Sequence, residues 1–184
     1  MNRVFLIITV FVFISPDYCI SQQSLNEVSM ITSVENGILQ AEAVVEFDGK
    51  STEELFSKSH EWVAKAFRNT ASVFQAQIEN EFLRISGISN SVLGPYLGNY
   101  MDLSFTLNID FKNEKIRVKA YDIEQVAKSS PYTVTPLEIL YDNNGKLKSA
   151  KRYKEAKAKI DAELTQILHS LISYLSNEKI EDEW

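Results

Sequence analysis

The sequence predicts an α+β domain of two layers, in which two helices cover one face of a five-stranded antiparallel sheet. Apolar and polar residues alternate in several segments, most clearly from Leu103 to Phe111, as is typical of strands with one buried and one wet face. Two other segments, which begin at Ser51 and at Lys151, place apolar residues at helical spacing. The expected order is strand, helix, four strands, helix.

The composition is that of a single globular domain. The chain has 184 residues, of which 45 % are hydrophobic and 24 % are charged, and a chain of this size can bury a substantial core. Its formal net charge is −6. Nucleic-acid binding usually requires a basic surface, because phosphate contacts supply most of the affinity. We therefore expect no nucleic-acid partner.

The first residues have the pattern of a secretory signal. Arg3 supplies a positive charge, and Val4 to Ile14 form an unbroken apolar run. A membrane-spanning helix needs about 20 apolar residues, so this run is too short to span and fits a signal peptide instead. The small residues Cys19 and Ser21 predict cleavage after residue 21. The protein is then exported, periplasmic or extracellular, and is not an integral membrane protein after signal removal.

Cys19 is the single cysteine, and it allows a second interpretation of this region. Lipid attachment there would make the chain an outer-membrane lipoprotein, but a small residue is needed before the cysteine, where this sequence has Tyr18. Cleavage after residue 21 removes the cysteine and any possibility of a disulfide. The expected organisation is a signal peptide (1–21), a flexible lead-in (22–37), one α+β domain (38–176) and an acidic tail (177–184).

The domain begins with a strand and a helix. In Ile38 to Phe47 apolar residues alternate with polar ones, and Asp48 to Lys50 form a turn. Ser51, followed by Glu54 three residues later, is a capping box that predicts a helix start. The helix ends near Asn69. One face of it is apolar or small: Leu55, Phe56, Ser59, Trp62, Val63, Ala66 and Phe67.

Four strands follow this helix. Residues 73–88 alternate in polarity and contain a turn near residues 79–81, which predicts two strands. Two further strands, 103–111 and 116–123, are joined by Asn113-Glu114 in a tight hairpin. With the first strand, these complete the sheet.

Residues 91–100 interrupt the strands and predict a loop, because Gly94-Pro95 and Gly98-Asn99 are typical turn pairs. The apolar residues of this loop either form a contact patch or tuck under the edge of the sheet. They are Leu93, Tyr96, Leu97 and Tyr100.

The chain closes with a short and a long helix. Thr135 and Pro136 predict a helical turn that ends before Gly145. The long helix runs from Lys151 to Ser176. Its apolar stripe consists of Tyr153, Ala156, Ile160, Leu164, Ile167, Leu171 and Leu175.

The triple His60-Glu61-Trp62 is the first candidate for a functional site, because it could belong to an active site. It begins like the zinc-protease motif H-E-x-x-H, but position 64, where the second ligand is required, is Ala. His60 and His169 are the only histidines, and both lie off the apolar stripes, so we expect solvated side chains. Trp62 lies on the stripe and is expected to anchor the core. We predict no catalytic residue, no metal ligand, no cofactor and no enzymatic activity.

A basic run at the start of the long helix is the second candidate for a functional site. Positive charge at a helix N-terminus is unfavourable, so the run is explained by an acidic partner, an anionic lipid headgroup, the protein's own acidic surface, or simple solvation. It comprises Lys146, Lys148, Lys151, Arg152, Lys154, Lys157 and Lys159, with only Glu155 against them. The possible binding patch therefore consists of Lys148, Lys151, Arg152, Lys154, Tyr96 and Tyr100.

Two stretches, "AVVEFDGKSTEELFSKSHEWVAKAF" and "LSFTLNIDFKNEKIRVKAYDIE", resemble a bacterial family. It is a domain of unknown function with a TATA-binding-protein-like (TBP-like) fold, found in exported proteins of Gram-negative bacteria. The resemblance covers about Ile38 to Ile123, with the final helix a weaker match. Its marks are the start of the first helix (Gly49, Lys50, Ser51, Glu54, Leu55), Trp62 and Tyr121-Asp122-Ile123. The resemblance implies the fold and carries over no catalytic residue.

These observations favour a non-enzymatic binding or structural module of the cell envelope. It would present the wet face of the sheet, or the loop 93–100, to an envelope protein or a glycan. The alternative is a carrier of a small apolar ligand, held between the C-terminal helix and the sheet. That alternative requires a cavity of roughly several hundred Å³ between the helix stripe and Phe105, Leu107 and Ile109.

Overall fold

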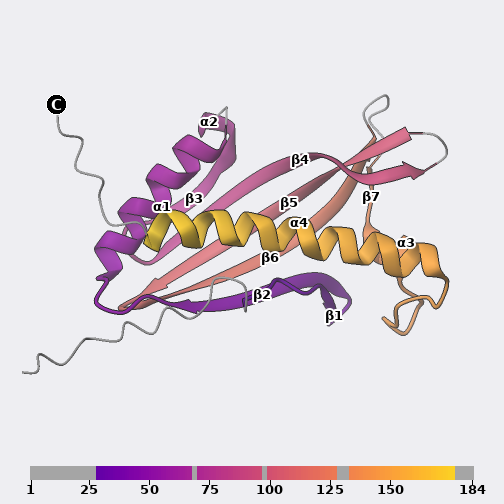
Figure 1. The fold of residues 1–184 in the computed structure, drawn as a ribbon, viewed down its shortest axis with the longest axis horizontal. Coiled ribbons are helices and arrows are strands. Elements are labelled where there is room, and N and C mark those ends of the chain that lie inside the picture. The colour runs from indigo at the N-terminus through magenta and orange to yellow at the C-terminus, as the bar shows by residue number, and fades with distance from the viewer. Residues whose placement is uncertain (1–27, 68–69, 97–98, 128–132, 177–184) are drawn as a thin grey trace, which may run out of the picture.

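The computed structural model describes residues 28–67, 70–96, 99–127 and 133–176 (Figure 1). The chain forms a twisted sheet with a long helix lying across it. Its elements are β1 (Ser33–Glu35), β2 (Ile38–Glu46), α1 (Thr52–Ala66), α2 (Thr70–Val73), β3 (Phe74–Ile78), β4 (Phe82–Tyr96), β5 (Asn99–Lys112), β6 (Lys115–Ala127), β7 (Thr133–Val134), α3 (Pro136–Leu140) and α4 (Lys151–Ser176).

The described strands form one antiparallel sheet in the order β1-β2-β6-β5-β4-β3, with β7 also paired to β6. The predicted two-layer α+β class is confirmed. The sheet has seven strands where five were expected. The additional strands, β1 with three residues and β7 with two, are too short to show a period in the sequence.

β4 and β5 extend through the segment expected to be a loop. β4 continues to Tyr96 and β5 begins at Asn99, so residues 91–96 are strand. The pairing is irregular there, with register shifts on either side of Leu93. Gly94 and Pro95 therefore mark an irregular strand rather than a loop, because bulges accommodate residues that cannot join a regular ladder.

Both long helices pack on the same face of the sheet. The inward side chains of β5, from Leu103 to Phe111, are buried, and the ring of Phe56 on α1 meets Phe111 edge-on at 5.4 Å. Trp62 is only 3 % exposed, which confirms its predicted place in the core, and its Nε1 donates to Ser170 Oγ on α4 at 3.1 Å. α4 has the predicted bounds. Its buried residues are Ile160, Leu164, Leu168, Leu171, Ile172 and Leu175.

The prediction of a flexible lead-in at residues 22–37 was wrong for residues 28–37. Met30 and Thr32 are buried, and Ser33 to Glu35 form β1. The predicted signal peptide, Cys19 and the tail 177–184 lie outside the described residues. Within the described part of the chain, no helix is both long and apolar enough to cross a membrane.

Gly87 on β4 provides the space into which two aromatic rings pack. It lies opposite Phe105 of β5 in the strand register. A Cβ atom at position 87 would lie 2.7 Å from Phe105 Cζ and 2.8 Å from Phe67 Cε1. Both rings would have to move, and Phe105 is enclosed in the core. Glycine is therefore required here by close packing.

We predict that Gly87→Ala lowers the free energy of unfolding by about 1–3 kcal/mol, because the added methyl group overpacks the core. Ile88→Thr, at the next residue and exposed, should change it by less than about 0.5 kcal/mol. Urea denaturation of the three proteins measures both values. An unchanged denaturation midpoint for Gly87→Ala would show that the rings adjust without cost.

Candidate functional site: the open face of the sheet

The triple His60-Glu61-Trp62 has structural roles. The ring of His60, exposed as predicted, stacks on Phe74 with centroids 4.4 Å apart. Glu61 accepts a hydrogen bond from Tyr174 on α4 at 3.1 Å. Together with the buried Trp62, these contacts tie α1 to its neighbours. Among the described residues, no group of three or more histidine, cysteine or acidic side chains could hold a metal ion.

His169 differs from the prediction of a solvated side chain. It is half-buried, and its Nε2 lies 2.7 Å from the carbonyl oxygen of Val28. Because a carbonyl only accepts, Nε2 carries the proton in this contact. The sequence could not show this contact, because its partner lies in the segment expected to be a flexible lead-in.

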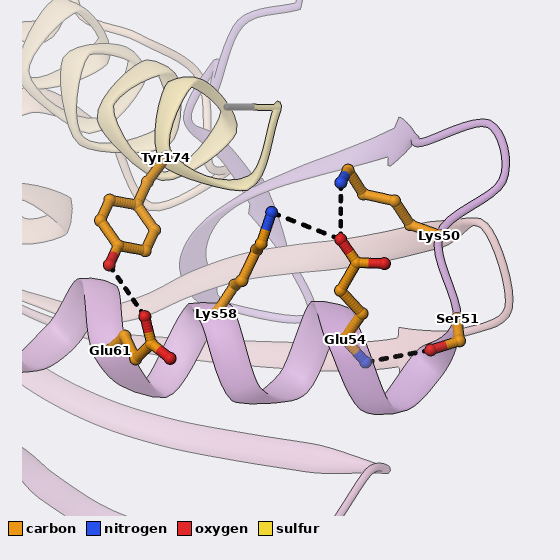
Figure 2. Close-up of polar contacts among 6 residues, drawn as sticks. All are labelled: Lys50, Ser51, Glu54, Lys58, Glu61 and Tyr174. Carbon is orange, nitrogen blue, oxygen red and sulfur yellow. Dashed lines mark hydrogen bonds and ion pairs between the residues drawn. The ribbon is translucent and has the colours of Figure 1, made fainter. Parts of the chain in front are cut away.

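The start of α1 is held by a small charged cluster (Figure 2). Ser51 Oγ accepts from the backbone N–H of Glu54 at 3.1 Å, which confirms the predicted cap. The carboxylate of Glu54 pairs with Lys50 at 2.7 Å and with Lys58 at 3.3 Å. The hydrogen bond from Lys50, more than any other cause, lowers the pKa of Glu54 below its ordinary value.

The structure explains two members of the basic run by contacts within the fold. Lys148 donates from Nζ to the carbonyl oxygens of Glu138 and Ile139, at 3.1 and 2.8 Å, and so neutralises the C-terminal end of α3. Lys157 pairs with Asp161 at 2.5 Å. These two cations serve the fold and are not available to a partner.

The other residues of the predicted patch are distributed as follows. Lys151, Arg152 and Lys154 are exposed in the first turn of α4, where Arg152 also donates to the Tyr153 hydroxyl at 2.8 Å. The side chains of Tyr96 and Tyr100 lie outside what the structure describes. Figure 1 places the β4–β5 hairpin end and the start of α4 at the same end of the molecule.

The sheet face opposite the helices, here called the open face, carries an ordered polar arrangement. The strand register gives its members. They include Glu42 and Val44 of β2; Arg117, Lys119 and Tyr121 of β6; Thr106, Asn108 and Asp110 of β5; Phe82, Arg84, Ser86 and Ile88 of β4; and Ile78 of β3.

Asn108 is the centre of this arrangement. Its Oδ1 accepts from Arg84 Nε at 3.0 Å and from the Tyr121 hydroxyl at 3.0 Å. The guanidinium of Arg84 also lies 5.4 Å from the centroid of the Phe82 ring and 5.9 Å from that of Tyr121. Four side chains from three neighbouring strands thus hold one another across the face. Such mutual contacts reduce the entropy that binding would otherwise cost.

A second contact on the open face joins Arg117 to Asp110. Arg117 Nε and one terminal nitrogen reach Asp110 Oδ2 at 2.8 and 2.7 Å. The hydrogen bond from Arg117 to Asp110 raises the pKa of Arg117, and their charge attraction adds to it. The pair is solvent-exposed, so it orients the side chains more than it stabilises the fold.

One row of the open face runs across five neighbouring strands, from β2 to β3. Strand pairing aligns Val44, Arg117, Asp110, Phe82 and Ile78 in that order. Val44 and Ile78, at the two ends, are 53 % and 56 % exposed. The row therefore has apolar ends and a charged centre, and it is accessible to a partner.

A shallow hollow lies beside this face, in the β1–β2 hairpin. Its volume is about 300 Å³, and it is lined by Ile31, Ser33, Glu35, Gln40 and Glu42. Gln40 Nε2 donates to a carboxylate oxygen of Glu35 across it. The hollow is polar and broad rather than an enclosed ligand cavity.

The interface between α4 and the sheet is filled. A cavity large enough for a ligand would leave its lining side chains accessible to water-sized molecules. Phe105, Ile109 and Leu164 are 2 %, 0 % and 0 % exposed. These side chains leave no ligand-sized space around them, and the carrier function lacks the cavity that would favour it.

The sequence indicated only part of the open face. The outward charges Asp110, Arg117 and Lys119 follow from strand alternation. The cluster of Arg84, Asn108 and Tyr121 does not, because it depends on which residues of three strands lie opposite one another. The only sequence signal for this cluster was the set of outward positions in the strand predicted at residues 82–88.

Comparisons with known proteins identify the fold. Residues 42–125 match a family model described as a domain of unknown function (DUF4468) with TBP-like fold. A TBP-like protein from Parabacteroides distasonis ATCC 8503 has a TM-score of 0.64 at 15 % identity, covering 79 % of this chain and 97 % of that one. A DUF4468 family protein from Bacteroides ovatus ATCC 8483 has a TM-score of 0.62 at 10 % identity, covering 82 % and 93 %.

No curated protein matches the sequence. At these identities the structural likeness establishes the fold alone. The resemblance seen in the sequence is confirmed.

The lowered pKa of Glu54 predicts a pH effect on stability. A carboxyl group with a lowered folded-state pKa stabilises the fold above its ordinary pKa, near 4.5, and this stabilisation is lost as the pH falls through the lower value. In Lys50→Met we expect the Glu54 titration midpoint to rise, as measured by NMR of its side-chain carboxyl carbon. Lys154→Met, an exposed control in the first turn of α4 at the opposite end of the molecule (Figure 1), should leave it unchanged. Equal midpoints in the wild type and Lys50→Met would contradict the assignment.

Proposed function

We propose that this chain, whose residues 42–125 match the DUF4468 family with a TBP-like fold, is a non-enzymatic binding module of the cell envelope. Its binding surface is the open face of the sheet, and its partner is a protein. The observation that carries this proposal is the row from Val44 to Ile78, with exposed apolar ends and a charged centre.

The chemistry of the open face supports a protein partner. Arginine and aromatic residues are enriched at protein interfaces and dominate their energetics. Arg84 is oriented by Asn108 and lies near the rings of Phe82 and Tyr121. Ile88, on the same strand as Arg84, adds a side chain that is 60 % exposed. A partner would bury these groups without first having to order them.

The absence of enzymatic activity is part of the same proposal. The sequence has two histidines, the side chain that most often serves as a general base. His60 stacks on Phe74, and His169 is engaged with the carbonyl of Val28. Neither arrangement is that of a base oriented by a carboxylate and directed at a nucleophile.

The envelope location rests on the N-terminal sequence. Val4 to Ile14 form the apolar core of a signal peptide, and Arg3 precedes it. The net charge of −6 argues against nucleic acid as the partner. Arg117 is also neutralised by Asp110 on the face itself, which reduces the attraction of that face for a phosphate backbone.

We predict that Val44→Glu combined with Ile78→Glu weakens partner binding while the protein stays folded. Both sites are more than half exposed, and surface substitutions usually change stability by no more than about 0.5 kcal/mol. Buried carboxylates at the interface should weaken binding at least about tenfold, which corresponds to about 1.4 kcal/mol. The measurement is quantitative affinity capture from envelope extracts, followed by a dissociation constant for the protein captured.

Ala162→Glu is the matched control, because Ala162 is exposed on α4 in the helix layer. It should capture the same protein as the wild type with unchanged affinity. Capture that is equal for the open-face variant and the wild type would refute this surface. Recovery of a glycan and no protein would refute the partner class.

A further inference from the structure

An extended segment at the start of the described chain lies along α4 and contacts it at every second residue. Residues 28, 30 and 32 alternate with Ser29 and Ile31, of which Ile31 is 56 % exposed. Three main-chain groups of the segment are hydrogen-bonded to the helix. The Val28 carbonyl accepts from His169 Nε2 at 2.7 Å, the Met30 N–H donates to Thr165 Oγ1 at 3.0 Å, and the Thr32 N–H donates to Asp161 Oδ1 at 2.9 Å.

The two spacings agree. Asp161, Thr165 and His169 recur every fourth residue of the helix, a rise of about 6 Å per step. Residues 28, 30 and 32 recur every second residue of an extended chain, a rise of about 6.6 Å. The helix therefore offers a row of polar groups at the repeat of an extended peptide, and the segment runs antiparallel to it.

The contacts are those by which proteins recognise an extended peptide. Side chains of α4 satisfy main-chain groups of the segment, which gives affinity for any extended chain. Specificity comes from two side chains: Met30 is inserted into the core at 1 % exposure, and the Thr32 hydroxyl donates to Asp161 Oδ1 at 2.6 Å. Ile31, between them, points away.

The three polar side chains of α4 are held in place without the segment. The helix is anchored by Leu164 and Leu168, which are buried. Asp161 is oriented by its ion pair with Lys157 one turn earlier. Apart from Met30, which enters the core, the described segment is joined to the sheet through the three residues of β1 and the turn at Asn36-Gly37, whose φ angles are 52° and 76°.

We propose that Asp161, Thr165 and His169 form a binding site for an extended peptide, and that residues 28–32 are its resident ligand. This segment leaves the site while the sheet and α4 stay folded. The site accepts an unbranched apolar residue followed, two residues later, by threonine. This surface is separate from the open face and does not depend on the proposed function.

The test uses the full chain with Met30→Asp, which ejects the resident segment because a carboxylate is costly to bury. A fluorescent peptide with the sequence of residues 27–34 is then added. We expect it to bind this variant at least about tenfold more tightly than the wild type, whose own segment competes at high effective concentration. Adding Asp161→Ala to the variant should abolish binding, and a peptide with Thr32→Val should bind more weakly.

Hydrogen exchange of the wild type provides the second measurement. The amide protons of Met30 and Thr32 should exchange at least about tenfold faster than those of β5, because the segment opens locally. Asp161→Asn should accelerate them further and leave β5 unchanged.

Three outcomes would overturn the proposal. The first is exchange of Met30 and Thr32 only together with β5, and the second is a folded Met30→Asp variant that fails to bind the peptide. Loss of the whole fold in Met30→Asp is the third, because the segment would then be an inseparable part of the core.

Discussion

Burial of the inward side chains of β5 beneath the helix layer is the interaction on which the rest of the structure depends. β5 lies inside the sheet, between β6 and β4, and its inward residues from Leu103 to Phe111 are all buried. A slip of one residue in register would turn this apolar set toward water. Packing of the helices on one face of the sheet therefore determines which residues of each strand lie on the open face.

The order of the open face follows from that constraint. Once Leu107 and Ile109 face the helices, Asn108 must face outward between Arg84 and Lys119, its partners in the register. None of the helices in the described part of the chain covers this face, so its polar groups bond to one another or to water. The ordered cluster around Asn108 is thus a consequence of core packing, yet it also leaves an accessible surface of the composition that proteins recognise.

The sequence predicted those parts of the structure whose signal is local and periodic. The bounds of α4, the cap at Ser51 and the inward residues of β2 and β5 depend on neighbours within a few positions along the chain. Contacts between distant segments could not be predicted in this way. The segment 28–32 was mistaken for a flexible lead-in because one of its inward residues, Thr32, is polar, and only Asp161, far along the chain, accounts for its burial.

The two candidate surfaces lie on opposite sides of the sheet. The segment 28–32 packs in the helix layer, where Met30 enters the core, whereas Arg84 and Arg117 project from the other side. A ligand on either surface leaves the other accessible. The two surfaces still share a core, because α4 packs against the strands whose outward residues form the open face. Release of Met30 would remove one side chain from that core and leave the register of β5, and with it the cluster around Asn108, in place.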